Sequence, residues 1–111
     1  MKESPIVVGN RYVNSIVAEI KLLEGRIEKH KEDMEYGFTF HNLASPCEML
    51  EKYYGTALRA AGFTFLMDKI QEIASQARAF ERILETEGKI STYIVIWNNY
   101  LKKLLPILFF L

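Results

Sequence analysis

The fold is decided by residues 64–88, which read TFLMDKIQEIASQARAFERILETEG. Apolar residues recur along this stretch at alternating steps of four and three, which is the spacing of one buried stripe on a helix. The stripe consists of Leu66, Ile70, Ile73, Ala77, Phe80 and Leu84. Thr64 is a polar start and Gly88 suits a left-handed exit, so the sequence predicts a helix of about six turns over 64–88.

Basic side chains gather on the opposite side of this helix. At about 100° per residue, Arg78, Arg82 and Lys89 fall within roughly 60° of one another. Glu85 shares their face, so the surface is mostly but not wholly basic. We interpret Arg78, Arg82 and Lys89 as candidate nucleic-acid-binding residues, and a merely solvated helix face is the alternative.

Composition restricts the class of protein. The 111 residues make one domain (1–111), and half of them are hydrophobic, which is ample for a core. Fourteen basic and fourteen acidic residues cancel, so no long-range field attracts nucleic acid and any such contact is local or shared with a partner. The single Cys47 cannot form an internal disulfide, and the N-terminal residues lack a secretory signal pattern. We therefore expect a cytoplasmic protein.

A second long helix is predicted over residues 10–34, and residues 1–9 are expected to be coil. Its apolar face has heptad-like spacing. The residues on that face are Val13, Ile16, Ile20, Leu23, Ile27, His30 and Met34. Gly25 lies on the opposite face, where it permits a kink or the close approach of a neighbouring backbone.

The segment 35–44 has a different pattern. Tyr36, Phe38 and Phe40 alternate with Gly37 and Thr39, which is the period of an extended segment and predicts an aromatic loop.

The tetrapeptide Ser45-Pro46-Cys47-Glu48 then reads as a capping box. Ser45 suits the N-cap, Pro46 the first helical position, and Glu48 the third. It predicts a helix over 45–61 that ends at Gly62.

Residues 90–105 fit either a strand or a helix, and their length favours a helix that Pro106 ends. The apolar tail 107–111 is too short to cross a bilayer, and Lys102 and Lys103 disfavour a span that includes them. The tail is expected to fold onto its own core or to dock on another chain. The whole chain is thus predicted to be all-α, a small bundle of about four helices.

Few residues point to catalysis. Cys47 is placed near a helix start, where a thiol pKa is lowered, but neither His30 nor His41 can be positioned beside it as a base. We interpret Cys47 as a small buried residue, His30 as a core-edge residue and His41 as a loop residue. Residues 26–30 resemble the Arg-to-His motif of HEPN ribonucleases, but with three intervening residues where that family has four to six. Cofactor and metal motifs are lacking, so we expect no catalytic site, no cofactor and no metal.

Residues 59–70 read RAAGFTFLMDKI. With the long helix that follows, they resemble the small subunit of the archaeal type I-A Cascade, a CRISPR antiviral effector complex, over roughly the second half of the chain. The resemblance implies a non-catalytic subunit that packs against itself and other effector subunits, and helps hold the guide RNA–DNA complex or single-stranded DNA. Two alternatives remain open, a stand-alone oligomeric interaction protein and a small HEPN-type ribonuclease.

Overall fold

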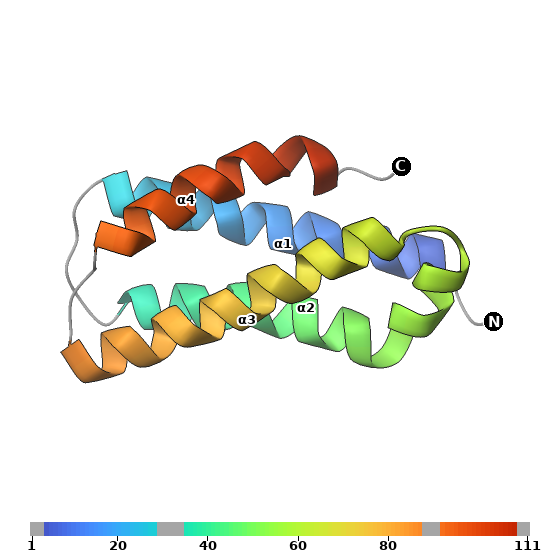
Figure 1. Cartoon of the computed structure of the whole chain (residues 1–111), viewed down its shortest axis with the longest axis horizontal. Coiled ribbons are helices and arrows are strands. Elements are labelled where there is room, and N and C mark those ends of the chain that lie inside the picture. The colour runs from blue at the N-terminus through green and yellow to red at the C-terminus, as the bar shows by residue number, and fades with distance from the viewer. Residues whose placement is uncertain (1–3, 29–34, 88–91, 109–111) are drawn as a thin grey trace.

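The computed structural model describes residues 4–28, 35–87 and 92–108, which form an all-α bundle (Figure 1). Its elements are α1 (Pro5–Glu28), α2 (Glu35–Ala60), α3 (Thr64–Glu87), α4 (Thr92–Leu104) and the short 3-10 helix η1 (Leu105–Leu108). Within these ranges there is no strand. The predicted fold class, a small bundle of about four helices, is confirmed.

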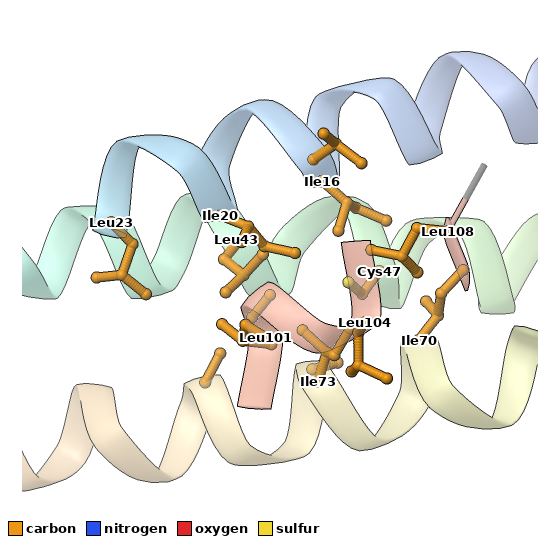
Figure 2. Packing of buried hydrophobic residues seen from close by; sticks show 14 of the residues in the cluster. Ile16, Ile20, Leu23, Leu43, Cys47, Ile70, Ile73, Leu101, Leu104 and Leu108 are labelled. Carbon is orange, nitrogen blue, oxygen red and sulfur yellow. The ribbon is translucent and has the colours of Figure 1, made fainter. Parts of the chain in front are cut away.

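The bundle is elongated, measuring 44 × 23 × 21 Å. Helix α2 packs along both α1 and α3, whereas α4 and η1 lie against α1 on the other side of the core. Side chains from all of these elements point into one interior, among them Ile20, Cys47, Ile70, Leu104 and Leu108 (Figure 2). One apolar core therefore holds the described helices together.

Helix α3 matches its prediction closely. It begins at Thr64, and every residue of the predicted stripe is buried except Phe80, which is partly buried against the core. The predicted stop at Gly88 lies outside the described residues.

The turn between α2 and α3 ends α2 as the sequence predicts. Gly62 has a φ of +100°, its N–H donates to the carbonyl of Arg59, and the N–H of Phe63 donates to the carbonyl of Leu58. This pair of bonds is a Schellman motif with Gly62 at the C′ position. Phe63 packs on the core, which sets the direction in which α3 leaves the turn.

Two glycine substitutions are expected to change stability in opposite directions. Gly62→Ala should lower the free energy of unfolding by about 1 to 2 kcal/mol, because a Cβ is strained in the left-handed region. Gly25→Ala should raise it by about 0.5 to 1 kcal/mol, since Gly25 is inside α1 and an added Cβ meets nothing within 4 Å. Urea unfolding of both variants measures this. A loss of stability in Gly25→Ala would contradict the straight course of α1 through that residue.

Helix α1 begins earlier than predicted. Residues 5–9 are helical rather than coil, because Pro5 occupies the first helical position and the Ser4 hydroxyl accepts the N–H of Ile6 at 3.2 Å. Val8 is buried, so its packing stabilises the additional helical turn. The helix continues through Gly25 to Glu28, and residues 29–34, including His30 and Met34, lie outside the described residues.

The predicted aromatic loop over 35–44 and the predicted helix start at Ser45 are both wrong. Helix α2 runs unbroken from Glu35 to Ala60 with Pro46 in its interior. The reason is tertiary packing: Phe40, Leu43 and Cys47 are fully buried at helical spacing, so the segment before Ser45 gains more from a helical face on the core than from an extended path. The Glu48 side chain is bonded to Arg78 on α3.

The C-terminal region is helical from Thr92, as its length predicts. Pro106 stands in η1, where α4 has ended, and Leu108 is buried in the chain's own core. Of the two predicted positions for the tail, the structure therefore supports the own-core position for Leu108, whereas Ile107 is exposed; residues 109–111 lie outside the described part. Among the described helices, none has the length and apolar character needed to span a membrane.

Candidate functional site

Arg78, the first candidate for nucleic-acid binding, lies in a cluster of charged side chains between α3 and α2. Its guanidinium donates to Glu48 through Nη2 at 2.6 Å and through Nε at 3.1 Å, and to Glu81 through Nη1 at 2.9 Å. The hydrogen bonds with Glu48 raise the pKa of Arg78 above its ordinary value. A phosphate at Arg78 would have to compete with the two carboxylates that already accept hydrogen bonds from its guanidinium group.

His41 completes this cluster. Arg78 Nη1 lies 2.8 Å from His41 Nδ1. The arginine N–H is the donor, so Nδ1 of His41 is the acceptor in this contact, and the same nitrogen lies 3.7 Å from Glu81 Oε1. His41 stands on α2 rather than in the predicted loop, and it is exposed.

Glu48→Gln is expected to cost at most about 1 kcal/mol of unfolding free energy near pH 7, because the Glu48–Arg78 pair is largely open to solvent. Its hydrogen bond with Arg78 lowers the pKa of Glu48 below the ordinary 4.5. The stabilisation is therefore present above pH 4.5 and disappears as the pH falls through the lowered pKa. Urea unfolding of wild type and of Glu48→Gln across this pH range should give free energies of unfolding that become equal at the acid end. Glu85→Gln, an exposed site on the same helix, is the control, and a pH-independent difference for Glu48→Gln would contradict the ion pair.

The three candidate residues are not equivalent in the structure. Arg82 is exposed on α3, one turn after Arg78, and no ion pair to its side chain occurs among residues 4–28, 35–87 and 92–108. Lys89 lies outside the described residues. The helix periodicity therefore predicted the shared side of Arg78 and Arg82, but it could not reveal the carboxylate of Glu48, which is contributed by another helix.

Cys47 is buried, as predicted, although not at a helix start. It is the thirteenth residue of α2, with no exposed surface, and burial raises its pKa well above the ordinary value. Cys47 lies in the core and His41 at the surface, so the two do not form a nucleophile and base.

A different surface, which the sequence did not single out, lies between α3 and α4. An open groove of about 320 Å³ separates the two helices. It is lined by Glu72, Gln76, Phe80, Tyr93, Ile96, Trp97 and Tyr100. Five of these seven side chains are aromatic or aliphatic, so the groove offers apolar surface with a polar edge on α3.

Tilted aromatic contacts lie beneath this groove. The ring of Trp97 lies 4.9 Å from that of Phe80 and 5.7 Å from that of Phe40, so α2, α3 and α4 meet in one aromatic cluster. At the edge, the Tyr100 hydroxyl donates to Glu72 at 3.2 Å, and Lys69 pairs with the same carboxylate at 3.5 Å. The groove wall is thus held in place by contacts within the chain.

The lip of the groove on α4 is strongly exposed. Tyr93 is 74% and Ile96 62% accessible to solvent. Helix α4 buries Ile94, Trp97 and Leu101 and leaves Tyr93 outside the core. The sequence of α4 has apolar residues around most of its circumference, which is typical of a helix covered on more than one side. This pattern could have indicated the exposed apolar surface.

The chain matches no protein-family model, no curated protein and no solved structure. Within the described residues, no three His, Cys, Asp or Glu side chains are grouped so that they could hold a metal ion.

Proposed function

We propose that this chain is a non-catalytic helical subunit of a larger assembly and that it docks on its protein partners through the surface between α3 and α4. The observation that carries the proposal is the exposure of Tyr93 and Ile96 beside an apolar groove. Contiguous exposed apolar surface of this kind marks an interaction site on a soluble domain. Aromatic side chains are also the residues that contribute most to protein interfaces.

The assembly that we propose is an RNA-guided CRISPR effector complex used in antiviral defense. Support for this choice comes from the resemblance of residues 59–70, which include the last two residues of α2, the α2–α3 turn and the first turns of α3. In such a complex the subunit would pack beside its neighbours and help hold target or displaced-strand DNA. Arg82 is exposed for a phosphate contact, whereas Arg78 would first have to leave Glu48 and Glu81. Since the net charge is zero, nucleic-acid binding would depend on neighbouring subunits.

A tagged full-length chain, purified from its native host, tests this proposal. We expect the effector subunits and a guide RNA carrying CRISPR repeat sequence to co-purify. Tyr93→Ala should reduce their recovery, because it removes the most exposed aromatic ring of the docking surface. Tyr53→Ala is the matched control, since Tyr53 is 58% exposed but stands on α2, away from the groove.

Recovery of the chain without guide RNA or effector subunits would contradict the CRISPR proposal. The stand-alone interaction protein is then the better candidate, because the α3–α4 surface supports it equally. Equal recovery with Tyr93→Ala and with wild type would show that the assembly forms through another surface.

A further inference from the structure

The outer edge of α4 carries a second pattern besides its buried face. Tyr93, Ile96, Tyr100 and Lys103, here called the α4 seam, follow one another at steps of three, four and three. This is the spacing with which one helix meets another along a coiled-coil line. Tyr93, Ile96 and Lys103 are exposed, and Tyr100 is partly buried.

The described part of the chain leaves Tyr93, Ile96 and Lys103 of the α4 seam exposed, while Tyr100 is partly covered by its contacts with the core. Helix α4 turns Ile94, Leu101 and Leu104 into the core, and the α4 seam faces away from them beside the open groove. Tyr93, Ile96 and Tyr100 belong to both the seam and the groove lining, so a helix laid along the seam would also close the lip of the groove.

We propose that the helix covering the α4 seam is α4 of a second copy of this chain, lying antiparallel to the first. The inference deepens the proposed function and rests on it for the role of this surface as the docking site. A formal net charge of zero means that two copies do not repel each other. A two-fold axis lets the same apolar residues serve both partners.

Charge placement selects the antiparallel direction. With the two-fold axis midway between Ile96 and Tyr100, Lys103 of one copy faces Tyr93 of the other. Its ammonium group can then lie over the tyrosine ring while its methylene chain covers apolar surface. A parallel pair would instead place Lys103 beside Lys103, which brings two like charges together at one end of the contact.

The exposed area sets the strength of the pair. Taking about 150 to 250 Å² for a large aromatic side chain, the α4 seam leaves roughly 300 to 400 Å² of largely apolar surface open on each copy. A standard interface buries about 800 Å² per partner, of which a little over half is apolar. The open area of the α4 seam is about half of that, so we expect a weak and reversible dimer.

The mass of the recombinant full chain tests the dimer. Sedimentation equilibrium over roughly 5 to 500 µM should show the mass rising from 12.9 kDa toward twice that value. Ile96→Glu should remain monomeric over the whole range, while Tyr53→Ala should behave as wild type. Lys103→Ala should raise the dissociation constant by about fivefold, because it removes the ammonium group that lies over the tyrosine ring. Circular dichroism confirms that each surface variant is folded.

Cysteine cross-linking tests the direction. Cys47 is fully buried, so an added surface thiol is the reactive one. In an antiparallel pair, a mixture of Tyr93→Cys and Lys103→Cys should form the mixed disulfide under mild oxidation. Neither variant should link to itself, since equal positions lie about 15 Å apart along the axis, which exceeds the reach of a disulfide of about 7 Å between Cα atoms.

Three results would overturn the inference. The first is a wild-type chain that stays monomeric at every concentration, and the second is an Ile96→Glu variant that dimerises as wild type does. The third is self-linking of each cysteine variant, which would show a parallel pair. These experiments use the isolated chain, so a monomer here leaves the effector proposal standing. Conversely, a native purification without guide RNA leaves the dimer standing.

Discussion

Phe40→Ala is expected to lower the free energy of unfolding by about 3 to 5 kcal/mol. Phe40 is fully buried, and its ring lies 5.7 Å from both Phe80 and Trp97. Its removal leaves a cavity where α2, α3 and α4 meet, and the surrounding helices can collapse into it only in part. Urea unfolding followed by fluorescence measures the loss directly, because Trp97 is the only tryptophan and is itself buried in this cluster.

Phe65→Ala is the control for this experiment. Phe65 is 61% exposed on α3, so its truncation should change stability by less than about 1 kcal/mol. A comparably small effect of Phe40→Ala would contradict the helical course of α2 through residues 35–44, because that course places Phe40 fully in the core.

Pro46→Ala is expected to stabilise the protein by about 1 to 2 kcal/mol. Pro46 stands inside α2, where proline is about 3 kcal/mol less favourable than alanine because it lacks the N–H and crowds the preceding turn. The greater freedom of the unfolded alanine chain offsets up to about 1 kcal/mol of this gain. Thermal and urea unfolding of the variant measure the net change.

Pro5→Ala provides the matched comparison. Pro5 is the first residue of α1, a position where the missing N–H has no partner within the helix, so the substitution should be close to neutral. If Pro46→Ala were equally neutral, and Ser45→Ala cost about 1 kcal/mol as the loss of an N-cap does, a helix beginning at Ser45 would be the correct description.

The contrast between these two prolines shows that a helix start cannot be predicted from neighbouring residues alone. Ser4-Pro5 and Ser45-Pro46 present the same start signal, and the second is stronger because Glu48 completes a capping box. Only the first begins a helix. Glu48 is bonded to Arg78, and the chain before Ser45 is drawn into the core by Phe40 and Leu43.

A local signal for the helical course of α2 was nevertheless present. Phe40, Leu43, Cys47, Leu50 and Leu58 follow a helical stripe that crosses the supposed boundary, and all five are fully buried. The alternation of Tyr36, Phe38 and Phe40 obscured it, since aromatic residues at a period of two also suit a strand.

For the candidate sites too, some features follow from helical periodicity and others depend on contacts with other helices. Helical periodicity alone placed Arg78 and Arg82 on one side of α3, because both belong to one continuous helix. It could not show that Glu48, thirty residues earlier, holds the Arg78 guanidinium. Nor could it separate Tyr93 from Ile94 and Trp97, because which apolar face of α4 is buried depends on where α1 and α3 lie.

The sequence by itself determined the all-α class, the course of α3 and the exit of α2 at Gly62. These features depend on periodicity and backbone conformation within a few residues. Only the tertiary structure decided that α2 passes through Pro46, that Arg78 is held by Glu48, and that the α4 seam stays exposed. Each of these depends on contacts between distant segments, and burial of side chains such as Phe40 is worth more than the local preference it overrides.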